Sequence, residues 1–277
     1  MKKNKVTQLI IAAIILVAGI AISIYGYLQR ADESYAHLKE LGKNKGIDML
    51  YAIGLVIVII GIVSLISTLV TKANEDKTPV IVLAQAALLA ALCFVGAGYL
   101  KIDIPVGTEK TMFHLGNVFC VLAALLIGGK WGGLAGAVGM TLSDLMTGYI
   151  TSAPKTFLLK FCIGLIVGLV AHKIFKITKE GFDAKKLPLA VVVSCVAGMG
   201  FNVVADPIVG YFYKTYLLGV PQDLAKALAK INSITTLVNA IIAVVVASVL
   251  YLALRPALRK AGLFHQIGNK NKLAKSI

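Results

Sequence analysis

Three ionisable side chains interrupt long apolar segments of this chain, and their types suit the binding of a polar small molecule. They are Asp144, Lys160 and Asp206. If those segments cross a bilayer, a charge in hydrocarbon costs at least about 2.5–3.5 kcal/mol on insertion scales. We therefore expect all three to face the interior of a helix bundle or a wet cavity, where they would form a polar pocket open to the outside.

Amide and imidazole side chains at helical spacing would complete such a pocket. His114 and Asn117 are spaced i, i+3, and Asn202 and Asp206 are spaced i, i+4, so each pair shares one helix face. Asn239 belongs to a polar stripe that repeats with the same period. These residues offer hydrogen-bond donors and acceptors to a ligand.

Aromatic side chains near the same helix ends could stack on a flat heterocycle, because an aromatic face suits a planar ring. Tyr149, Tyr211 and Tyr213 are the candidates for this role. The predicted substrate-binding residues are His114, Asn117, Asp144, Tyr149, Lys160, Asn202, Asp206, Tyr211 and Asn239.

A structural interpretation of the same residues stays open. Each Asp or Lys could end its helix at the membrane surface, and each Asn could hydrogen-bond to a neighbouring helix. The chain contains no HExxH or GxSxG pattern, so we expect neither an enzyme nor catalytic residues. The turn at residues 128–133 lacks the Gly-Lys-Ser/Thr ending of a phosphate loop.

Cysteine usage favours neither a metal site nor disulfides. No CxxC spacing occurs, and no His cluster accompanies the cysteines. Each one lies inside an apolar run, where a thiol behaves as a small buried hydrophobe. The four are Cys93, Cys120, Cys162 and Cys195.

The elements that must position these residues are membrane helices. Hydrophobic residues make up 58% of the 277 and charged residues only 15%, a balance that one water-soluble core could not bury. Apolar runs of about 20 residues recur, and none shows the period-two alternation of a strand. An all-α integral membrane protein is predicted, with spans near residues 6–28, 50–70, 79–99, 113–128, 131–149, 154–175, 188–211 and 231–254.

The distribution of basic residues predicts the orientation and argues against nucleic acid as the cause of the net charge of +15. Lys and Arg concentrate in the loop at residues 173–186 and in the tail after residue 254. Both segments belong on the cytoplasmic side of a multi-pass plasma-membrane protein, with both termini in the cytoplasm. The first span, which follows three lysines, is too long for a cleaved signal core.

A polar linker at residues 71–78 divides the chain, because the spans change character after it. The two spans before it carry almost no polar residue, and most of the six after it hold one near an end. We predict a two-helix membrane appendage with its linker at residues 1–77, a six-helix substrate-binding core at residues 78–262 and a basic cytoplasmic tail at residues 263–277.

The segment FHLGNVFCVLAALLIGGKWGGLAGAVGMTLSDLMTGY, followed by APKTFLLKFCIGLIVGLVAHKI, resembles the S components of energy-coupling factor (ECF) transporters, the riboflavin-type group in particular. The shared features are a polar LGN start containing Asn117, a Gly-rich hairpin, Asp144 before Gly-Tyr, and Thr156 four residues before Lys160. The resemblance covers residues 79–262 and implies a six-helix S-component-like bundle, here preceded by two extra transmembrane helices.

The resemblance also implies partners and no cofactor held by this chain. An S component takes a vitamin-like ligand from outside the cell and works with a transmembrane coupling subunit and two cytoplasmic ATPases, which use the ATP. Small residues of the first core helix dock the coupling subunit, and the matching positions are Ala86, Ala87, Ala90 and Ala91. The loop at residues 101–112 would cap the site.

Three functional hypotheses follow from the residues and the resemblance. The first is the substrate-specific subunit of an ATP-driven vitamin importer, with riboflavin as the leading ligand; another vitamin, a nucleobase-like precursor or a thiazole would fit the same residue types. The second is a standalone secondary carrier in which Asp144 or Asp206 couples to a cation. The third is a membrane scaffold or sensor whose polar residues only join helices.

Overall fold

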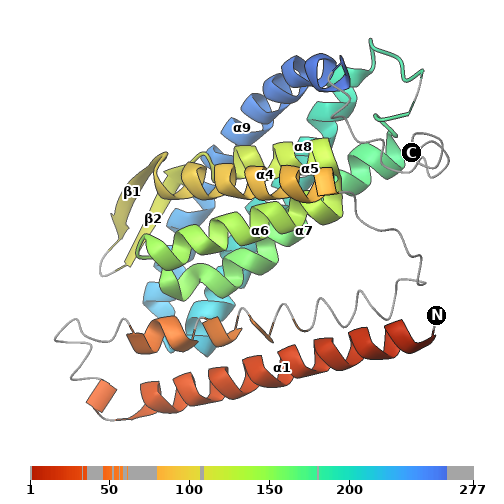
Figure 1. The fold of residues 1–277 in the computed structure, drawn as a ribbon. Helices are drawn as coiled ribbons and strands as arrows, with labels where there is room; N and C mark the ends of the chain where they lie inside the picture. The colour runs from red at the N-terminus through yellow and green to blue at the C-terminus, as the bar shows by residue number, and fades with distance from the viewer. Residues whose placement is uncertain are drawn as a thin grey trace. The chain divides into compact units, whose positions relative to one another are not determined.

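The computed structural model describes most of the chain and divides it into two compact units (Figure 1). One unit comprises residues 1–78 and 141–158, and the other comprises residues 79–140 and 159–277. The predicted tail at residues 263–277 lies outside the described residues. The described residues are 2–32, 34–35, 46–51, 53–55, 57–58, 61, 80–106, 109–179 and 181–260.

In the first unit, helix α1 (Lys2–Ala31) packs against helical residues of the segment 46–61 through glycines. A Cβ placed on Gly26 would lie 2.8 Å from the Cα of Tyr51, and one on Gly54 would lie 2.6 Å from the backbone nitrogen of Ser23. Such distances leave room only for glycine, so the two backbones are in direct contact. Most of the predicted span 50–70 lies outside the described residues.

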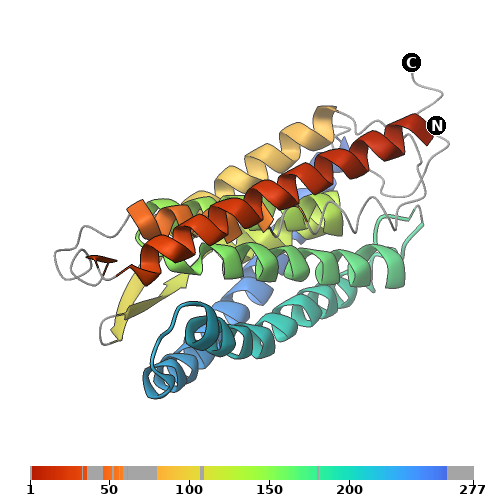
Figure 2. The ribbon, with the colours of Figure 1, turned by 90° about the horizontal axis from the view of Figure 1, so that it is seen from below.

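The second unit contains the helices that carry most of the predicted site. Two further helices, α6 and α7, contribute residues to both units. The π-helical segments η2 (Leu169–Ile174) and η3 (Tyr213–Leu217) extend α7 and α8. The helices are α4 (Val80–Gly98), α5 (Gly116–Ile127), α6 (Gly129–Met146), α7 (Ala153–Gly168), α8 (Leu187–Phe212) and α9 (Gln222–Lys260). α8 and α9 pack side by side (Figure 2).

The loop predicted at residues 101–112 is instead a β-hairpin, which extends beyond the ends of α4 and α5 (Figure 1). Its strands are β1 (Lys101–Val106) and β2 (Glu109–His114), paired antiparallel with Ile104 opposite Thr111. The prediction concerned the long apolar runs, and this hairpin lies outside them, where Lys-Ile-Asp-Ile alternates like a strand. Pro105 is tolerated because its position faces the outer edge of β1, where no ladder hydrogen bond is needed.

Helix lengths differ from the predicted spans at the hairpin end. α5 begins at Gly116, not at residue 113, because residues 113 and 114 complete β2. With 12 residues it is about 18 Å long, well short of a hydrocarbon core of about 30 Å. Among the described residues, four helices are long and apolar enough to cross a membrane, namely Leu9–Ala31, Ile150–Ile174, Leu187–Leu217 and Gln222–Leu258.

Glycines on three faces of α6 allow the second unit to pack tightly. A Cβ on Gly132 would collide with the backbone of Ala124 in α5, and one on Gly139 would collide with Ala90 in α4. Gly133 contacts the backbone of Gly164 in α7, one turn from an equivalent contact of Gly129. Around these crossings the core closes with Leu125, Met140, Ile163 and Tyr251, all of them almost fully buried.

Candidate binding site

His114 lies at the junction between β2 and α5, and its backbone and ring are both fixed. Its backbone N–H donates to Oδ1 of Asn239 on α9 at 3.0 Å. Its Nδ1 accepts a hydrogen bond from the backbone N–H of Gly116 at 3.1 Å. Because a backbone N–H can only donate, the proton of a neutral His114 ring resides on Nε2. The ring therefore offers one N–H donor.

The charge state of His114 follows from its position in the hairpin, where the residue is buried. Burial lowers the pKa of His114 from 6.5 to about 3, and the positive charges of Lys160 and Lys101 lower it as well. The negative charge of Asp206 acts in the opposite direction. Lys160 and Asp206, predicted for the same site from separate helices, therefore both act on His114, which stays neutral at physiological pH.

Two predicted asparagines of the second unit, Asn117 and Asn202, are buried with a side-chain carbonyl oxygen that no described residue satisfies. The side chain of Asn117 in α5 is 2% exposed and that of Asn202 in α8 is 1% exposed. Within the described residues, neither side-chain carbonyl oxygen accepts a hydrogen bond. A buried amide without a partner costs about 1–3 kcal/mol, so such groups require a function or a ligand.

Two charged residues of this unit that were predicted for the site, Lys160 and Asp206, are also held in place. Lys160 is only 7% exposed, and its backbone carbonyl accepts a 3.6 Å hydrogen bond from the Cys120 thiol of α5. Asp206 on α8 accepts a 3.0 Å hydrogen bond from the Thr236 hydroxyl of α9. Lys160 is thus buried within the helical assembly and Asp206 is half-buried against α9, in keeping with the cost of exposing a charge to hydrocarbon.

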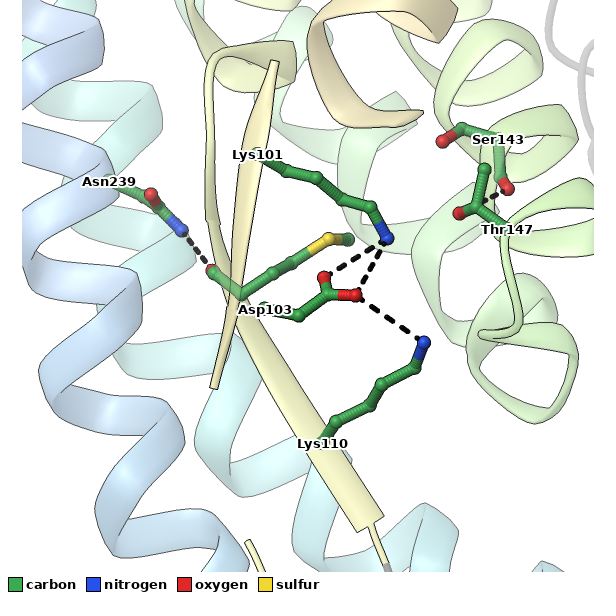
Figure 3. Close-up of polar contacts among 7 residues, drawn as sticks. Lys101, Asp103, Lys110, Ser143, Thr147 and Asn239 are labelled. Carbon is green, nitrogen blue, oxygen red and sulfur yellow. Dashed lines mark hydrogen bonds and ion pairs between the residues drawn. The ribbon is translucent and has the colours of Figure 1, made fainter. Parts of the chain in front are cut away.

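Asn239 on α9 bonds to β2 through its side chain. Its Oδ1 accepts from the His114 backbone, and its Nδ2 donates to the Met112 carbonyl at 3.1 Å (Figure 3). Both polar groups of the side chain thus bind β2. Its predicted contact with substrate stays a prediction, since these bonds describe a structural tie.

Two predicted residues, Asp144 and Tyr149, belong to the first unit. Asp144 in α6 is buried and accepts a 2.5 Å hydrogen bond from the Thr156 hydroxyl of α7. Its backbone carbonyl accepts a 3.0 Å bond from the backbone N–H of Tyr149, whose side chain is also buried. The tie between Asp144 and Thr156 holds the two helices together where the chain reverses direction.

The remaining aromatic candidates lie where α8 continues into η3. Tyr211 is half-buried and meets Phe212 edge to face at 5.3 Å between ring centroids. The Tyr213 side chain follows, with its hydroxyl buried. Phe212 is exposed and stacks on Tyr216 at 6.0 Å, a place typical of the aromatic belt at a membrane surface.

The four predicted docking alanines of α4 divide into two pairs. Ala86 and Ala90 belong to the core of the second unit, and the Ala90 carbonyl contacts Gly139. Ala87 and Ala91 are exposed.

The charged residues of the hairpin and its link to α9 were not predicted. Asp103 lies between Lys101 and Lys110, with ion pairs of 3.0 Å and 3.5 Å (Figure 3). The Thr111 hydroxyl meets the Thr235 hydroxyl of α9 at 3.1 Å. The alternation of residues 101–104 was the one feature of the sequence that could have revealed this hairpin.

Comparison with known proteins settles the family. Residues 77–256 match the family model described as ECF-type riboflavin transporter, S component. The chain belongs to this family of S components. The resemblance predicted from the sequence is thereby confirmed, and so is the all-α membrane fold. No curated protein and no solved structure shows significant similarity to the chain.

Family membership gives this S component its general role. The chain is a multi-pass membrane protein and the vitamin-transporting subunit of an ECF-type system, a family of transporters and not of enzymes. Membership implies association with ECF transmembrane and ATPase subunits and with a vitamin ligand.

Proposed function

We propose that this S component captures a water-soluble vitamin, with riboflavin as the leading candidate, at the extracellular side of the plasma membrane. The observation that carries the proposal is the set of buried polar residues at the hairpin end of the second unit. His114, Asn117, Lys160 and Asn202 are buried and Asp206 is half-buried, and these residues come from four different elements. A chain with a one-sided polar site suits capture of a ligand better than conduction through a channel.

The orientation rests on the charge at the opposite end. The end of η2 and its connection to α8 carry lysines that are all exposed, namely Lys173, Lys176, Lys179, Lys185 and Lys186. Exposed lysines on short loops mark the cytoplasmic side of membrane proteins. The hairpin end would then face the outside, with both chain termini in the cytoplasm.

The chemistry of the site suits a flavin-like heterocycle. Within the described residues the carbonyl oxygens of Asn117 and Asn202 accept no hydrogen bond, and the Lys160 ammonium and the His114 Nε2–H are hydrogen-bond donors. Riboflavin offers both donors and acceptors on its ring and its ribityl chain. Tyr211, in the same unit, would add a stacking face.

Transfer into the cell would require the coupling subunit and two ATPases. We propose that α4 docks the coupling subunit through Ala87 and Ala91, because these two are exposed. Ala86 and Ala90 are already engaged in the core. The predicted docking face is thereby narrowed to one pair of small residues.

Ligand capture is tested by purifying the chain in detergent without added vitamin and identifying bound molecules by native mass spectrometry and absorbance. Lys160→Met keeps the length of the side chain and removes the charge, and it should weaken riboflavin binding by about 10- to 100-fold, since a hydrogen bond to a charged group is worth about 1.5–3 kcal/mol. Lys185→Met, at an exposed lysine of the cytoplasmic connection, is the matched control.

The outcome separates the hypotheses. Stoichiometric riboflavin that is lost in Lys160→Met, with the melting temperature of the unliganded protein retained, would support capture. An empty protein whose melting temperature ignores riboflavin, thiamine and biotin would contradict it. Uptake into vesicles by this chain alone, abolished when the ion gradient is removed, would instead support a secondary carrier.

A further inference from the structure

We infer that Asn239 is a positioning residue that fixes β2, and through it His114, on helix α9. The inference rests on the proposed function only where it concerns a bound ligand. The two hydrogen bonds that link Asn239 to β2 join described residues of the second unit and do not depend on a ligand.

The register of the hairpin shows why one side chain can hold the strand. In an antiparallel ladder alternate residues direct their backbone groups toward the partner strand, and on β2 these are Thr111 and Phe113, which lie opposite Ile104 and Ile102. Met112 and His114 therefore direct theirs to the outer edge of β2. Within the part of the chain that the structure describes, the sheet has two strands, and no further strand pairs with this edge.

Asn239 takes the place of that missing strand. Its carboxamide accepts from the His114 N–H at 3.0 Å and donates to the Met112 carbonyl at 3.1 Å. One residue of a parallel neighbouring strand would make the same two bonds, because it pairs with the residues on either side of its counterpart. The side chain of a helix thus completes the edge of a sheet.

Two further contacts hold β2, one to α9 along the strand and one to α4 just beyond its His114 end. Thr235, one helical turn before Asn239, meets Thr111 at 3.1 Å, so β2 follows α9 over several residues. Beyond His114, the Leu115 N–H bonds to the Gly96 carbonyl at 3.0 Å and ties the same strand end to α4. The His114 end of β2 is thereby fixed between two helices.

Fixing this end has a consequence for the ligand site. His114 presents its Nε2–H from a backbone that Asn239 holds, so a displacement of β2 would displace that donor. Asn239 acts through His114 and needs no contact with the ligand. We expect its loss to shorten the residence time of a bound ligand more than it slows association.

The test uses the full chain in detergent and compares Asn239→Leu, Asn239→Asp and Ser233→Ala. Leu removes both bonds, whereas Asp keeps the acceptor for His114 and removes the donor for Met112. Ser233 lies on the same helix, but its hydroxyl bonds to the Ala229 carbonyl of its own helix, so its replacement leaves β2 untouched.

Two measurements are made on each protein. Hydrogen exchange of the ligand-free chain reports the His114 amide and the peptide covering β2. Stopped-flow fluorescence with riboflavin as the probe reports association and dissociation rates. Asn239→Leu should raise exchange in β2 and the riboflavin dissociation rate by about tenfold each, as expected for the loss of two hydrogen bonds. For Asn239→Asp, both rates should lie between those of the wild type and of Asn239→Leu. For Ser233→Ala, both rates should equal those of the wild type.

The inference is overturned if folded Asn239→Leu keeps wild-type exchange in β2, or if exchange rises equally throughout α8 and α9, which would indicate general loosening. An unchanged dissociation rate despite faster exchange would also overturn it, because His114 would not depend on the tie. If the wild-type protein ignores riboflavin, the proposed ligand fails, and exchange in the unliganded chain still decides the role of Asn239.

Discussion

The Thr236 hydroxyl on α9 donates a 3.0 Å hydrogen bond to the Asp206 carboxylate on α8 and so joins the two helices within the region of the proposed site. Thr236→Val keeps the shape of the side chain and removes the donor. We expect it to lower the free energy of unfolding by about 1–3 kcal/mol, because a carboxylate that is partly buried loses a hydrogen bond. Thermal unfolding in detergent measures the change.

Thr236→Ser is the matched control for this contact, since it retains the hydroxyl and removes only a methyl group. It should be clearly more stable than Thr236→Val. A Thr236→Ser protein that is less stable than Thr236→Val would show that packing of the methyl group matters more at this position than the bond to Asp206, and equal stability would contradict the predicted dominance of that bond.

The crossing of α6 and α7 gives a second prediction. A Cβ on Gly164 would collide with the backbone of Gly133, so Gly164→Ala must push the two helices apart. We expect a loss of about 1–3 kcal/mol in the free energy of unfolding, as for other overpacked sites. Thermal unfolding again provides the measurement.

Gly200→Ala provides the comparison, because a Cβ there meets nothing within 4 Å. In a helix interior, Ala is favoured over Gly by roughly 0.5–1 kcal/mol, so this variant should be as stable as the wild type or more so. A Gly164→Ala protein as stable as Gly200→Ala would contradict the close approach of α6 and α7.

Much of the fold could be predicted because hydrophobicity reports helices directly. The span predicted at residues 79–99 matches α4 at Val80–Gly98 to within one residue at each end. The hairpin was missed because its alternation is short and contains Pro105, and because length and hydrophobicity alone cannot separate a capping loop from two strands.

The site was harder to predict than the helices. Sequence spacing shows which residues share a helix face, but it does not show which distant residues they contact. The stripe containing Asn239 correctly indicated a polar face of α9. Its partners in β2 are more than a hundred positions away along the chain, so the use of both amide groups on Met112 and His114 could not be inferred. The same limit applies to Ala86 and Ala87, which differ in burial although they are adjacent.

The exposure of Ala87 and Ala91 gives a third prediction. If this pair docks the coupling subunit, Ala87→Leu should reduce copurification of that subunit at least tenfold, because close approach of helix backbones needs small side chains. Riboflavin binding by the isolated chain should remain unchanged. Ala86→Leu should instead destabilise the chain itself, because Ala86 is buried in the core. If the coupling subunit copurifies normally with the Ala87→Leu protein, the face of α4 that carries Ala87 and Ala91 is not the docking site.

The burial of His114 gives a pH dependence with a definite sign. Well above pH 6.5 the ring is neutral in both the folded and the unfolded chain, so it contributes no slope. Below that value the unfolded chain takes up a proton, whereas the folded chain, with a pKa of about 3, does not. The free energy of unfolding should therefore decrease as the pH is lowered, and the contribution of His114 to this decrease should be about 2 kcal/mol at pH 5.

His114→Gln isolates the effect, because Gln has no titratable ring and can still accept the bond from the Gly116 N–H through its side-chain carbonyl. Chemical unfolding in detergent at pH 7.5 and pH 5 gives the two differences. All other carboxyl and imidazole groups titrate in both proteins, so the wild type should lose about 2 kcal/mol more than the variant over this range. Equal losses would mean that His114 is accessible to protons in the folded chain, and its assignment as a neutral Nε2–H donor would then fail.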